Sequence, residues 1–240
     1  MTDKQNTVPA EQEVTTVLIV DDHPAIQETL QMAIGKKEDF AVAGAVTSED
    51  EALRFIRSSP PNLVIADIGL RESYGLKLIR EIHTESQDIF IVVYSMFDEY
   101  IYASRSISAG AHGYVMKTSP VRQLFIAIDT VLQGDIYVSD EMASYFLDTL
   151  DVPPEQDTNR RLDVLSDREL AVFHCLGAGR SITEISDQLD TSKRVIRAAR
   201  RKIKKKLELD SVREVLDVAI HWFNRYSTIV KGSSQIDDLT

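Results

Sequence analysis

The sequence contains one cysteine and no long apolar run. The single Cys175 excludes an internal disulfide and a cysteine-rich metal site, and its apolar helical surroundings favour a packing role. No apolar run approaches the ~20 residues of a membrane-spanning helix, so we expect no membrane partner. The first fifteen residues (MTDKQNTVPAEQEVT) are polar and lack the apolar stretch of a signal peptide, which predicts a disordered tail on a cytoplasmic protein.

Acidic side chains outnumber basic ones, and the excess is confined to one part of the chain. The formal net charge of the 240 residues is −11. Residues 161–240 hold 15 basic and 12 acidic side chains, whereas residues 1–160 hold 12 basic and 26 acidic ones. A chain of this length is typical of two domains, and the charge asymmetry predicts that they perform different tasks.

The first half of the chain alternates short apolar runs with helical patterns. Five strands alternating with five helices predict a parallel sheet covered on both faces, that is, a doubly wound α/β domain with a flavodoxin-like (βα)5 order. The predicted strands are residues 17–20, 40–46, 63–66, 89–94 and 113–116. The predicted helices are residues 24–35, 49–58, 75–86, 98–109 and 119–132.

The rest of the chain shows helical patterns only, interrupted by one linker and followed by a tail. A sixth helix is predicted at residues 139–150, and residues 151–161 (DVPPEQDTNRR) are typical of a linker. Four further helices, forming a small all-α domain, are predicted at residues 166–178, 181–189, 192–208 and 211–223. The predicted segments are therefore a tail (1–15), an α/β domain (16–138), a helix with a linker (139–161), a helical domain (162–226) and a flexible tail (227–240).

Polar side chains follow four of the predicted strands. Asp21 and Asp22 follow the first strand, Asp67 the third, Ser95 the fourth and Lys117 the fifth. In a parallel sheet these positions lie on one edge, where α/β domains bind their ligands. Three carboxylates at one place require a hard cation, and Mg²⁺ accepts carboxylates together with waters and phosphate oxygens. This set predicts phosphoryl transfer to the Asp67 carboxylate, with Ser95 and Lys117 stabilising the phosphoryl oxygens.

A concentrated basic segment occupies the second half. Residues 192–207 (SKRVIRAARRKIKKKL) contain nine lysines and arginines and no acidic residue. A solvated surface helix normally mixes both signs, so nine unopposed cations indicate a polyanionic partner. Together with the short helix and tight turn before it, this segment predicts a helix-turn-helix whose basic helix enters the major groove of double-stranded DNA.

The first half resembles the receiver domain of bacterial two-component response regulators. The resemblance rests on the acidic pair Asp21 and Asp22, on Asp67, and on Ser95 and Lys117, at spacings that match the family. It implies that Asp67 accepts a phosphoryl group from a sensor histidine kinase, that the acidic pair and Asp67 bind Mg²⁺, and that Ser95 is the switch hydroxyl. Phosphorylation would then draw Ser95 inward.

Further positions extend the resemblance over residues 16–132. Tyr114 matches the switch aromatic, which would follow Ser95 inward and shift the surface of the fourth and fifth helices. Gly75 matches a family glycine. Arg71 and Thr118 stand where the family commonly has proline, which alters loop geometry without removing a catalytic group.

The second half resembles the LuxR/FixJ-type DNA-binding domain over residues 162–223, in segments such as Leu165-Ser166-Asp167-Arg168-Glu169. A receiver followed by this module is the layout of NarL/FixJ-type response regulators. Val195 and Ala199 depart from the family, in which threonine and histidine are common. The candidate base contacts are Lys193, Arg194 and Arg197, and the candidate phosphate contacts are Arg200, Arg201, Lys204 and Lys205.

The sequence therefore predicts a phosphorylation-controlled transcriptional regulator, catalytic only in its own phosphoryl transfer and dephosphorylation. Its expected partners are a histidine kinase, promoter DNA and, when active, a second copy of the chain, with RNA polymerase as a further candidate. The switch would favour dimerisation or release the basic helix.

Three alternatives can be weighed from the sequence. A haloacid-dehalogenase-like phosphatase also places carboxylates around Mg²⁺, but it requires its second aspartate two residues after the first, and Asp22 follows Asp21 directly. A regulator whose output is protein binding would not need specific DNA. His23 is either a phosphoryl carrier or an exposed structural residue before the first helix, and the second interpretation is favoured.

Overall fold

The computed structural model describes residues 14–70, 76–149, 162–189 and 191–233. The predicted linker and most of the predicted N-terminal tail lie outside these residues, and Thr15 already belongs to the first strand. The described helices include none that is both long and apolar enough to cross a bilayer.

A five-stranded parallel sheet forms the centre of the N-terminal domain, in the order β2-β1-β3-β4-β5. The strands lie within one residue of the predicted ranges at their carboxyl ends, which confirms the doubly wound fold. They are β1 (Thr15–Val20), β2 (Phe40–Val46), β3 (Leu63–Ala66), β4 (Phe90–Ser95) and β5 (Gly113–Met116).

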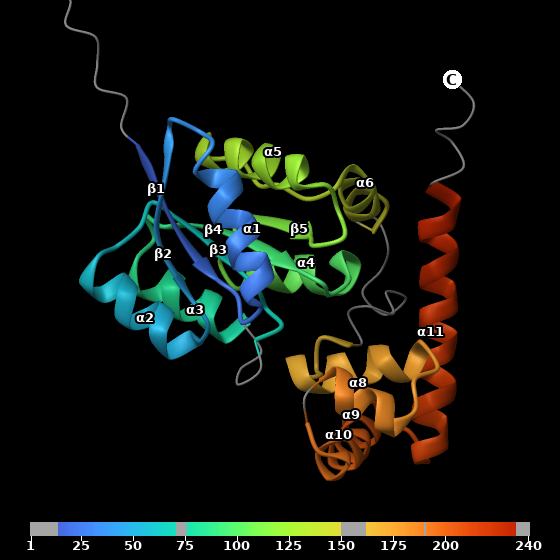
Figure 1. Cartoon of the computed structure of the whole chain (residues 1–240). Coiled ribbons are helices and arrows are strands. Elements are labelled where there is room, and N and C mark those ends of the chain that lie inside the picture. Colours follow the sequence, from blue (N-terminus) through green and yellow to red (C-terminus); the bar gives the residue numbers. More distant parts are fainter. Residues whose placement is uncertain (1–13, 71–75, 150–161, 190, 234–240) are drawn as a thin grey trace, which may run out of the picture.

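Helices cover both faces of the sheet (Figure 1). Alternate residues of β1 face opposite sides, as the pleat of a strand requires: Val17 and Ile19 pack with α1 and α5, and Leu18 and Val20 pack with α2, α3 and α4. Each such fully buried aliphatic side chain contributes ~1.5–3 kcal/mol. The helices are α1 (Pro24–Ile34), α2 (Glu49–Ser58), α3 (Leu76–Glu85), α4 (Glu99–Ser108), α5 (Val121–Leu132) and α6 (Asp140–Thr149).

The C-terminal domain consists of packed helices. Ser166 and Ser181 begin the first two of them with capping boxes, in which Glu169 and Glu184 bond back to the cap. The first helix packs closely on the last because position 177 is glycine: a Cβ there would lie 2.5 Å from the Ala219 carbonyl oxygen. The helices are α8 (Asp167–Gly177), α9 (Ile182–Gln188), α10 (Lys193–Lys206) and α11 (Val212–Ser233).

Helix α11 is longer than the sequence predicted. The prediction ended this helix at residue 223 and began a flexible tail at residue 227, whereas α11 continues to Ser233. The segment contains no proline, and its first glycine is Gly232. Extending an existing helix costs far less than starting one, so polar residues after position 226 are not enough to end it. The prediction of a tail over residues 227–233 was therefore wrong.

The two domains are in contact. Side chains of α3 and α4 in the N-terminal domain reach the start of α8, and apolar packing is continuous from the α2–α4 side of the sheet into the C-terminal domain. Cys175 of α8 is buried and belongs to this shared apolar packing. Burial raises the pKa of its thiol to about 11, so the reactive thiolate is scarce at neutral pH.

Candidate functional site

The carboxyl edge of the sheet gathers the polar side chains that the sequence singled out. Because β1, β3, β4 and β5 are neighbours in that order, the residues that follow them converge. Main-chain bonds continue past the strands and fix these residues: Asp67 N donates to the Val20 oxygen (2.8 Å), and Lys117 N donates to the Ser95 oxygen (2.7 Å). The expected grouping of Asp67, Ser95 and Lys117 is therefore present.

Lys117 bridges two of the carboxylates. Its Nζ lies 2.7 Å from Asp21 Oδ2 and 2.6 Å from Asp67 Oδ2, and its side chain is only 2% exposed. Burial opposes the charged ammonium, but the Asp67 and Asp21 carboxylates outweigh it and raise the pKa of Lys117. The ammonium is thus a fixed positive charge between two acidic side chains.

The other oxygen of Asp67 is also held. Asp67 Oδ1 accepts hydrogen bonds from Ser95 Oγ and from the Gly69 main-chain nitrogen, both at 2.8 Å. A Cβ on Gly69 would lie 3.2 Å from the same oxygen, so glycine lets the loop approach the carboxylate closely. Gly69 is a contact that sequence reasoning missed, because nothing in the local pattern shows which loop atom meets the carboxylate.

The acidic pair completes a cluster that has the chemistry of a cation site. Ligand atoms of Asp21, Asp22, His23 and Asp67 all lie within 4.8 Å of one another. Three carboxylates against one ammonium leave two negative charges, and hard oxygen donors of this kind suit Mg²⁺. His23 Nδ1 lies 2.8 Å from Asp22 Oδ1, and the imidazole side chain is 57% exposed. His23 is thus an exposed residue beside the carboxylates, directly before α1.

Tyr114 connects the site to the loop that follows β4. Its ring is fully buried, burial raises the pKa of its phenol well above the usual value, and its hydroxyl donates to the Phe97 carbonyl oxygen at 2.9 Å. The sequence predicted that phosphorylation would draw Ser95 and then Tyr114 inward. In this structure Ser95 contacts Asp67 and the buried Tyr114 points inward, which is the arrangement that the prediction assigned to the phosphorylated form.

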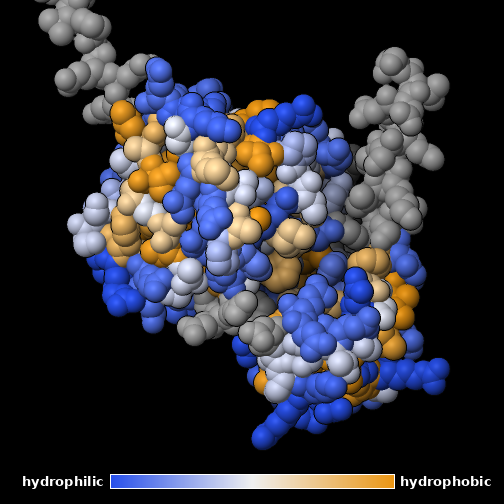
Figure 2. Space-filling model, viewed as in Figure 1, coloured by the Kyte–Doolittle hydropathy of each residue, from blue (hydrophilic) through white to orange (hydrophobic). Residues whose placement is uncertain are grey.

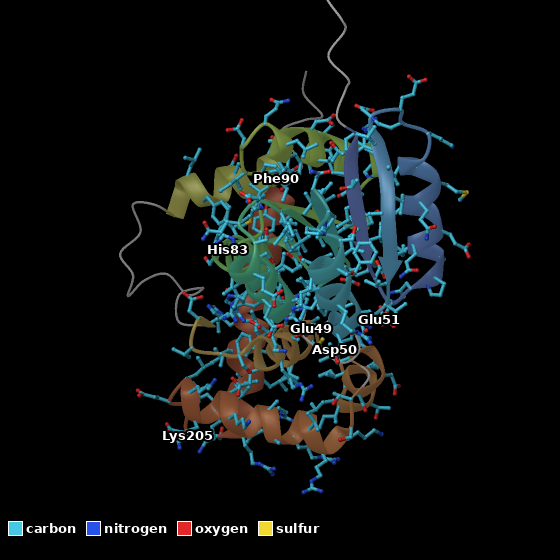
Figure 3. All side chains as sticks on the ribbon, turned by 90° about the vertical axis from the view of Figure 1, so that its left-hand side faces the viewer. Glu49, Asp50, Glu51, His83, Phe90 and Lys205 are labelled. Carbon is cyan, nitrogen blue, oxygen red and sulfur yellow. The ribbon has the colours of Figure 1, made fainter. Side chains whose placement is uncertain are left out.

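The basic helix α10 presents one apolar face and one cationic face. Ile196, Ala199 and Ile203 are buried against the rest of the domain, and Ser192 caps the helix. Lys205 lies on the side of the domain far from the sheet (Figure 3), and Figure 2 shows hydrophilic side chains projecting from this end of the molecule. The exposed cations among the predicted DNA contacts are Lys193, Arg194, Arg197, Arg201 and Lys205.

One predicted DNA contact on α10 differs from expectation. Arg200 is half-buried and its Nη2 donates to the Val212 oxygen at 3.4 Å, which directs part of its guanidinium into the protein. Ala199 is 4% exposed and belongs to the core of the domain. The alanine in place of a family histidine is therefore a packing feature of this chain. Val195 is half-buried at the first turn of the helix.

Comparisons with known proteins agree with both halves of this description. The family profile described as "Response regulator receiver domain" matches residues 17–129, and that described as "Bacterial regulatory proteins, luxR family" matches residues 163–219. The "Fimbriae Z protein" of Salmonella typhimurium is 30% identical over 211 residues, covering 85% of this chain and 95% of that protein. A "Putative transcriptional regulator" of Pseudomonas aeruginosa is 30% identical, covering 86% and 97%.

Solved structures show the same fold. A two-component response regulator of the LuxR family from Aurantimonas sp. is 28% identical, with a TM-score of 0.54, over 57% of this chain and 97% of that one. RcsB from Salmonella enterica serovar Typhimurium, bound to promoter DNA, is 21% identical, with a TM-score of 0.56, over 86% and 98%.

Proposed function

The chain belongs to the response regulators that join a receiver domain to a LuxR-type DNA-binding domain, and on this premise we propose that phosphorylation of Asp67 controls its binding to promoter DNA. The observation that carries this proposal is the convergence on Asp67 of Lys117, Ser95 and two further carboxylates at one edge of the sheet. The proposed phosphoryl donor is a sensor histidine kinase, and the transfer from the kinase to this chain is proposed to take place in the cytoplasm.

The transfer forms one bond and breaks one. An Asp67 carboxylate oxygen bonds to phosphorus while the bond between phosphorus and the donor's nitrogen breaks, and its electron pair leaves with the imidazole of the kinase, which takes up a proton. Lys117 and Ser95, each already at hydrogen-bonding distance from Asp67, are placed to contact the phosphoryl oxygens. The chain catalyses only this transfer and the later hydrolysis of its own acyl phosphate.

Asp21, Asp22 and Asp67 are the residues that would hold Mg²⁺. When bound, the ion neutralises charge on the phosphoryl oxygens and so lowers the barrier to transfer. The chain's own part is to hold the three carboxylates together. Lys117 contacts Asp21 and Asp67, and His23 Nδ1 lies 2.8 Å from Asp22 Oδ1 while its main-chain nitrogen donates to Asp21 Oδ1 at 2.9 Å.

Removing the divalent cation should stop phosphorylation of the isolated chain. We expect incubation with acetyl phosphate and Mg²⁺ to add one phosphoryl group, and EDTA to lower the initial rate about 100-fold, because the three carboxylates then repel the incoming phosphoryl oxygens. Intact mass spectrometry measures the incorporation, and Mn²⁺, which prefers the same oxygen ligands, should restore it. Equal rates with and without EDTA would contradict the assignment of this cluster as a cation site.

The DNA-binding half uses the exposed face of α10. Lys193, Arg194 and Arg197, near the start of the helix, are proposed to contact base edges, and Arg201 and Lys205 to contact phosphates. Lys206 is excluded from this role because its Nζ donates to Glu169 Oε2 at 2.6 Å within the domain. Lys204 and Arg200 are half-buried and supply at most weaker phosphate contacts.

Phosphorylation is proposed to act through pairing of two chains. Five of the predicted DNA contacts are already exposed, so uncovering the basic helix is not required. A dimer binds two half-sites at once, which multiplies its affinity for a palindromic promoter. The rival function, binding to a protein such as RNA polymerase without specific DNA, predicts no steep salt dependence of duplex binding, and a salt titration separates the two.

A further inference from the structure

A cleft of about 350 Å³ lies between the two domains at the edge of the sheet that carries Asp67. One wall comes from receiver loops, including Asp22, Gly69 and Phe97, and the other from the C-terminal domain, including Arg168, Gln188 and Thr191. Gly69 is also the residue whose nitrogen bonds to Asp67 Oδ1. The cleft therefore borders the Asp67 site through Asp22 and Gly69, and the DNA-binding domain forms its outer side.

We propose, on the premise that Asp67 is the phosphoacceptor, that the DNA-binding domain selects among phosphoryl donors by closing this cleft. With the domains in contact, a small acyl phosphate reaches Asp67 through the cleft. A phosphohistidine carried on a helix of a kinase reaches it only after the domains separate. The DNA-binding domain thus acts as a specificity element of the phosphorylation site.

The available space supports this distinction. Asp67 is 4% exposed and Ser95 1%, and the cleft borders them through Gly69, whose nitrogen bonds to Asp67 Oδ1. A helix with its side chains is ~10–12 Å wide, and three turns of it occupy more than about 1,000 Å³, several times the volume of the cleft. Acetyl phosphate, with only a few non-hydrogen atoms, is smaller than the ligands that pockets of ~300 Å³ typically hold.

Arg105 on α4 holds the domains in this position. Its guanidinium donates to the carbonyl oxygens of Leu162 (2.7 Å) and Leu165 (3.0 Å) and to Asp167 Oδ1 (3.3 Å), and its side chain is 15% exposed. Arg80 on α3 lies 3.8 Å from the other oxygen of Asp167. A buried guanidinium that makes three bonds across an interface is a specific attachment, since the planar fork fixes the direction of each bond.

The same interface is connected to the switch residues. Phe97 lines the cleft, and its main chain is held at both ends: its nitrogen donates to Ser95 Oγ (3.3 Å) and its oxygen accepts from the Tyr114 hydroxyl (2.9 Å). Any change in Ser95 that accompanies phosphorylation therefore reaches a residue in contact with the DNA-binding domain. The domain contact and the phosphorylation site therefore share Phe97 as a common structural element.

The test compares two donors on the full-length chain and on Arg105→Ala. The small donor is acetyl phosphate, and the large donor is the autophosphorylated cytoplasmic fragment of a histidine kinase chosen because it phosphorylates the wild-type chain. In both reactions the Asp67 carboxylate forms its bond to phosphorus as the donor's bond to phosphorus breaks. We expect Arg105→Ala to raise the initial rate from the kinase about tenfold, through loss of the bonds that hold the closed form, and to change the acetyl phosphate rate less than about twofold.

Two further variants keep the result interpretable. Arg80→Ala removes the longer contact to Asp167 and should raise the kinase rate by a smaller factor, which tests the proposal even if Arg105→Ala is poorly folded. Arg57→Ala is the matched control, because Arg57 pairs with Glu85 at the opposite edge of the sheet. It should leave the rates from both donors unchanged.

The outcomes separate this inference from the proposed function. A rate from the kinase that Arg105→Ala leaves unchanged, or equal increases from both donors, would overturn donor selection while leaving Asp67 as the phosphoacceptor. Failure of both donors to label Asp67 in the wild-type chain would overturn the proposed function itself.

Discussion

The variant Asp67→Asn should accept no phosphoryl group from acetyl phosphate or from a histidine kinase. An amide nitrogen or oxygen does not replace the carboxylate oxygen as a nucleophile toward phosphorus. The substitution also removes one of the two carboxylates that pair with Lys117, so the ammonium keeps its ion pair with Asp21 and loses that with Asp67. Phosphoryl incorporation, measured by intact mass and by peptide mapping, should fall to background.

The matched control for this variant is Asp50→Asn. Asp50 is an exposed carboxylate in the first turn of α2 (Figure 3), a helix that starts at the same edge of the sheet. The variant removes one negative charge near the site without touching Asp67, and it should be phosphorylated at the wild-type rate. Labelling of Asp67→Asn at a rate near that of the control would mean that another residue accepts the phosphoryl group.

Replacing Lys193, Arg194 and Arg197 together by alanine should weaken specific DNA binding at least about 100-fold, since each good base contact is worth ~1–3 kcal/mol. These side chains are exposed at the start of α10, so their loss leaves the buried face of the helix intact. A gel-shift titration on a duplex selected from a random pool measures the affinity.

Salt dependence adds a second readout for this variant. Each lost phosphate contact lowers the slope of log affinity against log salt by about one unit, so Lys205→Ala alone should reduce the slope while weakening all sequences alike. The charge-matched control removes three exposed cations from the receiver and should keep the affinity within about threefold. Its positions are Lys36, Arg54 and Arg122. If the control and the α10 variant lose affinity equally, α10 does not recognise the DNA.

The grouping of polar side chains at one edge of the sheet was predictable from the sequence, because the carboxyl ends of parallel strands lie at the same edge. Once β1, β3, β4 and β5 are identified as buried apolar runs, the residues that follow them belong to one edge, and Asp67, Ser95 and Lys117 meet there as predicted. The starts of α8 and α9 were equally predictable, because Ser166 and Ser181 are each followed three residues later by the glutamate of a capping box.

What the sequence did not reveal depends on contacts between distant segments. Gly69, Phe97 and Arg105 acquire their roles from the loops and the domain that they meet, and their local patterns differ little from those of other surface residues. The length of α11 escaped prediction because polar composition is a weak signal for the end of a helix.

The most direct test of phosphorylation control compares DNA affinity before and after phosphorylation of the same chain. The wild-type protein is titrated against the selected duplex untreated and after acetyl phosphate with Mg²⁺, with Asp67→Asn treated in the same way. We predict that phosphorylation tightens wild-type binding at least about tenfold, which corresponds to ~1.4 kcal/mol, and leaves the variant unchanged. Equal wild-type affinity in the two states, with phosphorylation of Asp67 verified by mass, would contradict control of DNA binding by this site.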